Sequence, residues 1–234
     1  PKPSSAASDV YKRQVEIIMG KETSQETLAK TMDYVQKIRK TPIVVNDSRG
    51  FFTSRVFGTY TGEGVAMLAE GINPALIENA GKMTGMPMAP LALSDAVALD
   101  LAWKVTTQTK KDFEAEGKEF PVTPMYSIME EMVEKQGRFG KKNNKGFYEY
   151  PENGKKFLWP ELSNLCKLSD EQPDVEELKK RFLYIQALET AKCYEENVLT
   201  DVRDADIGAI LGWGMAPWTG CLLYTSPSPR DLST

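Results

Sequence analysis

The stretch from Val15 to Arg55 reads VEIIMGKETSQETLAKTMDYVQKIRKTPIVVNDSRGFFTSR, and it decides the fold class of the N-terminal part of the chain. Val15 to Ile18 and Ile43 to Val45 are short apolar runs rich in β-branched residues, which is typical of buried strands. Between them, apolar residues recur at helical spacing behind a capping box of Thr23 and Glu26, and a proline stops the helix. The order strand, helix, strand predicts the end of an α/β sheet, too short to be a domain by itself.

The composition excludes several classes of protein. The chain has 234 residues, of which 41% are hydrophobic and 26% charged, enough for one sizeable globular domain or two small ones. Its net charge of −4 argues against a general nucleic-acid binder, because phosphate contacts need an excess of Lys and Arg. The three cysteines lack metal-ligand or redox spacing, which favours a reducing compartment. The chain contains no histidine, so imidazole chemistry is excluded for this chain taken alone.

No apolar run approaches the roughly 20 residues that a membrane helix requires, and the N-terminus lacks the apolar core of a signal peptide. We therefore expect a protein without a membrane span, located in the cytoplasm if bacterial or in an organelle matrix if eukaryotic. Residues 1–14 and 221–234 are rich in Ser, Pro and charge without helix or strand periodicity. We expect both ends to be non-native tails, and the alternative is a pair of flexible native tails.

From Gly50 onward the apolar periodicity becomes helical. One helix is expected to end at Gly71, and Asn73 with Pro74 begins the next. Further helices are expected over 91–109, 124–136, 176–197 and 204–211, with a short strand over 147–150 and a connecting segment over 151–173. Asp47 and Asp95 are expected to be helix caps.

The helical part contains an internal repeat, which is visible when the chain is shifted against itself. The shift is 126 residues at first, since 181 minus 55 is 126, and 127 after one inserted residue. The first set of matches pairs Arg55, Glu63 and Glu70 with Arg181, Glu189 and Glu196. The second set pairs Gly81, Gly85, Met88, Ala89 and Pro90 with Gly208, Gly212, Met215, Ala216 and Pro217. The in-register Met-Ala-Pro run favours duplication over the pattern that any two amphipathic helices share.

Three ordered motifs resemble the 3-hydroxyacyl-CoA dehydrogenase family. They are VNDSRGFFTSR at 45–55, GMPMAPLALSD at 85–95 and GRFGKKNNKGFY at 137–148. The resemblance runs from about Val15 to Gly220, and the repeated helical unit is similar to the multifunctional fatty-acid oxidation enzymes, which join an enoyl-CoA hydratase to this dehydrogenase. It implies a mainly α chain: the C-terminal remnant of a Rossmann α/β domain followed by two duplicated helical units of the dehydrogenase C-terminal type.

The resemblance also implies a domain organisation. Residues 15–46 are expected to be the end of the NAD-binding Rossmann domain, and residues 47–150 the first helical substrate and dimerisation domain. A linker over 151–175 then leads to the start of a second helical repeat over 176–220.

What the resemblance implies chemically is NAD-dependent oxidation of an L-3-hydroxyacyl-CoA to a 3-ketoacyl-CoA during β-oxidation. In the family a histidine upstream of the first strand is the general base, and a Glu on that strand orients it; Glu16 occupies that position. A carboxylate on a buried strand needs a partner, whereas an edge-strand Glu facing water is the alternative. Ser54 stands where many relatives have a substrate-binding Asn, and a solvent-facing Ser at a helix start is the alternative. Lys142 matches a lysine that approaches NAD, and Arg55 is expected to form a structural ion pair.

The parts needed for activity alone are missing from this sequence. No Gly-x-Gly-x-x-Gly turn for the pyrophosphate exists, and no Tyr is followed by Lys four residues later. We therefore expect a catalytically silent fragment of a dehydrogenase that binds NAD weakly or not at all. The alternative function is a non-catalytic helical module that binds acyl-CoA or a second copy, and a thiolase subunit is a further possible partner. A different hydroxy-acid dehydrogenase with a similar helical domain is a third reading.

Overall fold

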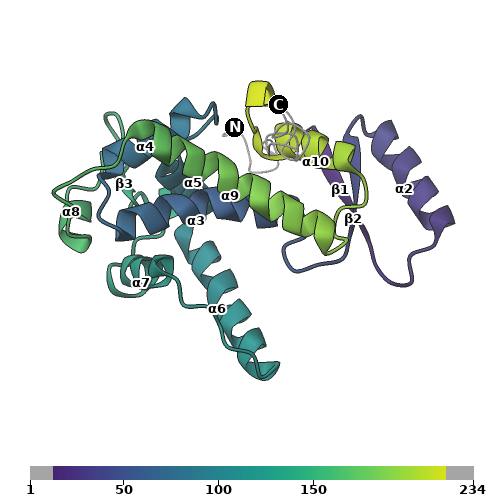
Figure 1. Cartoon of the computed structure of the whole chain (residues 1–234), viewed down its shortest axis with the longest axis horizontal. Coiled ribbons are helices and arrows are strands. Elements are labelled where there is room, and N and C mark those ends of the chain that lie inside the picture. The colour runs from purple at the N-terminus through teal and green to yellow at the C-terminus, as the bar shows by residue number, and fades with distance from the viewer. Residues whose placement is uncertain (1–12, 220–234) are drawn as a thin grey trace, which may run out of the picture. The chain divides into compact units, whose positions relative to one another are not determined.

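The computed structural model describes residues 13–219, and helices dominate this part of the chain (Figure 1). The chain divides into two compact units. Unit 1 contains residues 13–59, 85–87 and 183–219 of the described chain, and unit 2 contains residues 60–84 and 88–182. The long helices α3 (Thr53–Ala69) and α9 (Val175–Glu195) each contribute residues to both units.

Unit 1 begins with the predicted strand, helix and strand. Strands β1 (Gln14–Met19) and β2 (Thr41–Asn46) run parallel, with Ile17 opposite Val44, and helix α2 (Gln25–Lys37) connects them. Parallel strands require such a crossover, so the fold class of this segment was predicted correctly. The first strand starts at Gln14, one residue inside the expected tail, whose other residues lie mostly outside the described part of the chain.

The capping box predicted for α2 is wrong by one residue. Ser24 is the N-cap, and its hydroxyl accepts a hydrogen bond from the backbone N–H of Thr27 at 3.1 Å. Thr23 instead accepts from the N–H of Gly20 at 3.0 Å and closes the turn between β1 and α2. Both residues are good caps, and the turn after the strand selects between them.

The C-terminal residues complete the core of unit 1 and cover its strand pair. Val45 of β2 forms an antiparallel bridge with Leu199, and the N–H of Asn46 donates to the carbonyl of Val198 at 2.9 Å. Helix α10 (Val202–Gly208) supplies Asp204, whose carboxylate accepts from the N–H of Val44 at 3.0 Å. These contacts satisfy backbone groups of β2 that an open edge would leave unpaired. The buried cluster around them comprises Ile43, Val45, Phe52, Val56, Cys193, Val198, Leu199, Ala205, Ala209 and Met215.

Two turns follow α10 in unit 1. The first is a π-helical turn over Ala209–Trp213, and the second is a 3-10 turn over Pro217–Thr219. The helix predicted over 204–211 therefore begins two residues earlier and changes hydrogen-bonding pattern at Ala209. Trp213 packs edge-on against Phe52, with ring centroids 5.5 Å apart, and so joins this turn to the start of α3.

Unit 2 is built mainly from helices. They are α4 (Pro74–Met83), α5 (Pro90–Val97), α6 (Leu99–Ala115), α7 (Pro124–Glu130) and α8 (Leu162–Leu165), with a π-helical turn over Glu131–Lys135 and a 3-10 turn over Lys141–Asn143. Strands β3 (Tyr148–Glu149) and β4 (Phe157–Leu158) pair antiparallel. The single helix predicted over 91–109 is wrong, because Ala98 has a positive φ of 74° and breaks it into α5 and α6. The predicted connecting segment contains β4 and α8.

Two glycines let the helices of unit 2 approach the start of α5. A Cβ atom at Gly64 would lie 2.6 Å from Cβ of Pro90, and one at Gly81 would lie 2.4 Å from Cδ of Pro90. Only glycine fits these close contacts. In unit 1 the repeat-equivalent of Gly81 is Gly208, which packs instead against Ile43 and Phe52. The repeated glycines are therefore used for different close contacts in the two units.

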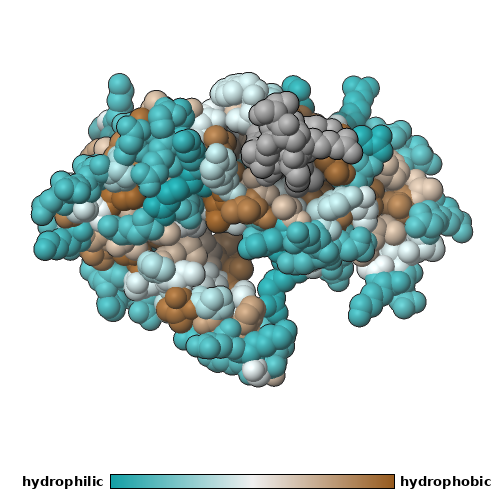
Figure 2. Space-filling model, viewed as in Figure 1, coloured by the Kyte–Doolittle hydropathy of each residue, from teal (hydrophilic) through white to brown (hydrophobic). Residues whose placement is uncertain are grey.

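Hydrophobic residues form separate patches among hydrophilic ones on the face shown in Figure 2. Leu101 and Val105 of α6 and Tyr184 and Leu188 of α9 are among the exposed apolar side chains. Within residues 13–219, no helix is both long and apolar enough to span a bilayer.

Candidate functional site

The carboxylate of Glu16 binds the start of helix α3. Its Oε1 accepts hydrogen bonds from the backbone N–H groups of Phe52 at 3.1 Å and Thr53 at 2.9 Å, and its Oε2 accepts a short hydrogen bond from the Thr53 hydroxyl. The first N–H groups of a helix have no partner within the helix and carry partial positive charge, so a carboxylate is stabilised there. The expectation that Glu16 needs a partner is met inside this chain, and the alternative of a water-facing Glu is wrong.

Ser54 follows Thr53 directly and is exposed at the same helix start. Glu16 binds the residue before Ser54, because Thr53 donates to it through both its N–H and its hydroxyl. This geometry fixes the backbone at Ser54 relative to β1. Whether the Ser54 hydroxyl contacts substrate stays a prediction.

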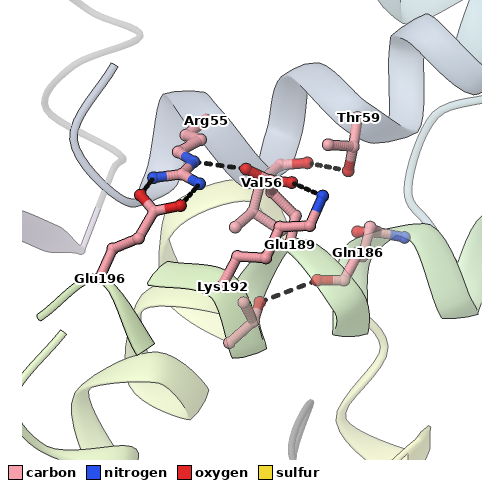
Figure 3. Close-up of polar contacts among 8 residues, drawn as sticks. Arg55, Val56, Thr59, Gln186, Glu189, Lys192 and Glu196 are labelled. Atoms are coloured by element: carbon pink, nitrogen blue, oxygen red, sulfur yellow. Dashed lines mark hydrogen bonds and ion pairs between the residues drawn. The ribbon is translucent and has the colours of Figure 1, made fainter. Parts of the chain in front are cut away.

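Arg55 is an ion-pair residue, as predicted. It binds the carboxylates of Glu189 and Glu196 (Figure 3). The hydrogen bond to Glu196 holds the pKa of Arg55 above its ordinary value, with Glu189 acting in the same direction and burial opposing both. The guanidinium charge of Arg55 is therefore neutralised by these two carboxylates, and we assign Arg55 no role in substrate binding.

Lys142 belongs to unit 2 and lies in the turn Lys141–Asn143. Its Nζ is 2.6 Å from Oδ2 of Asp100, in the first turn of α6, and this hydrogen bond lowers the pKa of Asp100. The Lys142 side chain remains 59% exposed, so it can still meet a ligand phosphate. No sequence pattern connects Asp100 with Lys142, because 42 residues separate them.

Asp95 is not the helix cap that was predicted, since the N-cap of α5 is Ala89. Asp95 is completely buried near the end of α5, and its carboxylate accepts from the N–H groups of Phe147 at 2.8 Å and Tyr148 at 2.9 Å and from the hydroxyl of Tyr150 at 3.0 Å. Burial raises the pKa of Asp95 to about 6, while these hydrogen bonds oppose the rise. Asp95 therefore ties the second family motif to the third.

Glu78 of α4 is a second buried carboxylate that binds backbone N–H groups, and it was not predicted from the sequence. It is buried and accepts from the N–H groups of Leu91 at 2.7 Å and Ala92 at 3.2 Å, at the start of α5, and from the Tyr148 hydroxyl. Burial raises the pKa of Glu78, and the Tyr148 bond opposes that rise. A Glu on an otherwise apolar helix face is a signal that could have indicated a buried carboxylate. Its partner, the N–H of Leu91, is thirteen residues further along the chain.

A polar groove of about 520 Å³ lies in unit 1 where β1 and β2 end. Its lining includes Gly20 and Lys21 after β1, Asp47 and Ser48 after β2, and Glu196. Ligands of open α/β sheets bind outside the carboxyl ends of strands, which is where this groove lies. Asp47 lines the groove rather than capping a helix, so its predicted role is wrong as well.

The described residues do not form a cradle for the pyrophosphate of a dinucleotide. Such a cradle needs free N–H groups at a helix N-terminus after a glycine-rich turn. Here the turn between β1 and α2 contains only Gly20, the N–H of Thr27 is bound by Ser24, and Glu26 places a negative charge in the first turn of α2. The part of the Rossmann domain seen here does not fit the cofactor phosphates by itself.

Two family models match the chain in consecutive segments. The NAD binding domain of 3-hydroxyacyl-CoA dehydrogenase matches residues 10–48, and the C-terminal domain of 3-hydroxyacyl-CoA dehydrogenase matches residues 50–150. The fold and these matches together define the end of an NAD-binding domain followed by a helical domain. The matched segments cover more than half of the sequence and contain Glu16, Ser54 and Lys142. The chain belongs to the 3-hydroxyacyl-CoA dehydrogenase family.

Several solved dehydrogenase structures are similar to this chain. A 3-hydroxybutyryl-CoA dehydrogenase from Escherichia coli K12 is similar over 94% of this chain and 62% of its own, with a TM-score of 0.67 and 19% identity, which shows the fold alone. The (S)-3-hydroxybutyryl-CoA dehydrogenase PaaH1 from Ralstonia eutropha is 30% identical over 61% of this chain and 49% of its own, with a TM-score of 0.53. FadB2 of M. tuberculosis is 25% identical over the same shares, with a TM-score of 0.51. The chain spans less than two thirds of each of these proteins.

Proposed function

We propose that this chain is part of an NAD-dependent L-3-hydroxyacyl-CoA dehydrogenase that oxidises 3-hydroxyacyl-CoA to 3-ketoacyl-CoA in fatty-acid β-oxidation. The observation that carries the proposal is the consecutive match to both domains of that family, with Glu16 held at the junction between them. NAD supplies the hydride acceptor in this reaction. The base and the pyrophosphate cradle are supplied by sequence that this chain does not contain.

Glu16 is the residue that we assign to proton transfer, as the carboxylate that orients an imidazole base. Each carboxylate oxygen has about two lone-pair sites, so the pair accepts about four hydrogen bonds. Three sites are taken by the N–H groups of Phe52 and Thr53 and by the Thr53 hydroxyl. The remaining site is available for an imidazole N–H, and the three fixed donors hold the carboxylate in one orientation for it.

Ser54 and Lys142 are proposed to bind ligands rather than to react. The exposed Ser54 hydroxyl is proposed to donate a hydrogen bond to the substrate, and Lys142 is proposed to approach the phosphates of NAD. The pairing of Lys142 with Asp100 supports a fixed position for its ammonium, since a long flexible side chain loses less entropy on binding when it is already held.

The first experiment mixes the purified chain with NAD and 3-hydroxybutyryl-CoA and follows NADH absorbance. No turnover is expected, because the chain has no histidine. Measurable NADH formation would contradict the proposal that the catalytic base is not part of this chain.

A second experiment measures binding of 3-hydroxybutyryl-CoA by calorimetry. Ser54→Ala should weaken binding by roughly 2- to 10-fold, the value of one neutral hydrogen bond. The exposed Ser163→Ala is the matched control and should change nothing. Equal affinity of Ser54→Ala and the unmodified chain would remove Ser54 from the substrate site.

A second candidate function is a non-catalytic helical module that binds acyl-CoA or pairs with another chain. The observation that favours it is that Arg55 and Arg181, related by the repeat, each bind two carboxylates of the other repeat. The second repeat also supports a multifunctional parent, for which we propose an enoyl-CoA hydratase domain, a thiolase partner and a cytoplasmic or organelle-matrix location. Co-purification of tagged chain with purified thiolase tests that partner.

A further inference from the structure

The backbone that binds Glu16 follows a strained turn. Gly50 and Phe51, just before α3, have positive φ values of 79° and 47°, a conformation that is unfavourable for a phenylalanine. The next two residues, Phe52 and Thr53, donate their N–H groups to Oε1 of Glu16. A strained backbone conformation persists only where the surrounding packing holds it. The residues packed against this turn therefore control the hydrogen bonds that Glu16 receives.

Phe52 is the side chain that fixes the turn in the core of unit 1. It is completely buried in the cluster around β2. A Cβ atom at Gly208 of α10 would lie 2.9 Å from Cε1 of Phe52, so the ring lies directly against that helix. Trp213, in the π-helical turn after α10, meets the Phe52 ring edge-on, with the two ring planes at 65°. Gly208 and Trp213 both belong to the second helical repeat, so that repeat holds the Phe52 ring.

Trp213 is itself fixed by a second contact within unit 1. Its indole Nε1 donates a hydrogen bond of 3.1 Å to Oε1 of Gln186, a completely buried residue on the α9 helix drawn in Figure 3. A buried amide oxygen that loses its donor is costly, so this bond favours one orientation of the indole. The neighbouring backbone also approaches the start of α3, because a Cβ atom at Gly212 would lie 3.2 Å from Cγ2 of Thr53.

We propose that Trp213 is a positioning residue for the carboxylate assigned to proton transfer: by holding Phe52, it holds the N–H groups that orient Glu16. Trp213 acts through the ring and backbone of Phe52. The proposal rests on the proposed function and deepens it, because it gives the second helical repeat a part in arranging the proton-transfer site.

A positioning role and a purely structural role predict different responses to the loss of the indole. A purely structural tryptophan stabilises unit 1 as a whole, so its loss should loosen α2 and the start of α3 alike. A positioning tryptophan acts on the turn over residues 50–53, so its loss should release the amides of Phe52 and Thr53 selectively. Amide hydrogen exchange distinguishes the two roles, because it reports the opening of each hydrogen bond separately.

The first measurement is amide exchange by NMR on the isotopically labelled full-length chain. In Trp213→Leu, the amides of Phe52 and Thr53 should exchange roughly tenfold faster, equivalent to about 1.4 kcal/mol, as expected for the loss of an aromatic pair. The amide of Val35, buried in α2, should change by less than about twofold. Trp218→Leu is the matched control, since Trp218 is 75% exposed, and it should leave all three amides unchanged. Equal acceleration at Val35 would show a purely structural role and overturn the proposal.

The amide proton signals of Phe52 and Thr53 give a spectroscopic test of the same contact. Hydrogen bonding to a carboxylate shifts an amide proton downfield, so Glu16→Ala should move both signals upfield. Trp213→Leu should move them in the same direction. Trp213→Phe keeps an aromatic ring beside Phe52 and should leave them in place. Unmoved signals in Trp213→Leu would overturn the proposal.

The unmodified chain decides the question if the variants do not fold. In exchange measured at rising urea concentration, the amides of Phe52 and Thr53 should open together with the amide of Met215, which donates to the carbonyl of Ala209 at 3.1 Å across the π-helical turn. Opening of Phe52 and Thr53 separately from Met215 would overturn the proposal.

This proposal and the dehydrogenase assignment can fail independently. None of the exchange measurements depends on turnover, so a negative result leaves the dehydrogenase assignment intact. Formation of NADH by this chain would contradict the assignment of the base to missing sequence and would leave the exchange rates unchanged.

Discussion

Asp95 makes the stability of this chain depend on pH in an unusual direction. Burial raises the pKa of Asp95 from 3.8 to about 6, so the folded chain binds its proton more tightly than the unfolded chain. A group with a raised pKa contributes stability that is fully present below the unfolded value and is lost as pH rises through the folded value. The protein should therefore become more stable on mild acidification, through this residue, between pH 7 and 5.

The magnitude follows from the two pKa values. For a folded pKa of about 6 and an unfolded pKa of 3.8, the free energy of unfolding rises by about 1.3 kcal/mol between pH 7 and pH 5. Asp95→Asn removes this gain. In the unmodified chain the N–H groups of Phe147 and Tyr148 each donate to one carboxylate oxygen of Asp95. In the variant one of these two N–H groups faces the amide NH2 group of Asn, which is also a donor. The variant should lose roughly 2–4 kcal/mol at pH 7 and about 1.3 kcal/mol more at pH 5.

Urea unfolding followed by circular dichroism at the two pH values measures both quantities. The difference between the unmodified chain and Asp95→Asn isolates Asp95 from other titrating groups, including Glu78. Asp170→Asn, at an exposed position, is the control and should stay within about 0.5 kcal/mol at either pH. An equal response of the unmodified chain and Asp95→Asn to pH would refute the argument that burial governs this carboxyl group.

Three further predictions concern single contacts. Gly146→Ala would place a Cβ atom 2.0 Å from Oδ1 of Asp95, so thermal unfolding should show a loss of at least roughly 2 kcal/mol; an unchanged melting temperature would contradict the close contact. Thr53→Val removes the hydroxyl bond to Glu16 and should cost about 1 kcal/mol in urea unfolding, whereas Thr53→Ser should keep it; equal losses in both would show that the hydroxyl is unimportant. Lys142→Met should cost under about 1 kcal/mol, because the Lys142 side chain is 59% exposed and water screens its charge, and should raise the pKa of Asp100 in an NMR titration; an unmoved carboxyl signal would exclude the pair.

The local sequence pattern correctly predicted the elements that are stabilised by residues close in sequence. The β-branched runs gave β1 and β2, and Asn73 caps α4 through its side-chain oxygen, 2.9 Å from the N–H of Ala75, as its position before Pro74 predicted. The sequence pattern predicted the wrong structure where tertiary contacts decide between two conformations that are both possible locally. Ala98 adopts a positive φ between two apolar helical segments, a conformation that no feature of residues 91–109 signals.

The candidate site shows the same division. The sequence singled out Glu16, Ser54 and Lys142 through family motifs, since the chemistry of a position is carried by residue type. It could not show that the partner of Glu16 is the start of α3, because the donors are mainly backbone N–H groups, which every residue except proline has. Nor could it show that Asp100 holds Lys142.

The sequence alone determined the family, the missing imidazole and the 126-residue repeat, because these are properties of residue identity and spacing. Only the tertiary structure decided what the repeated charges do. The shift aligned Arg55 with Arg181, but a pattern cannot show whether aligned residues contact each other, solvent or nothing. Folding brings each arginine to the glutamates of the other repeat, since a guanidinium leaving water needs carboxylates within hydrogen-bonding distance.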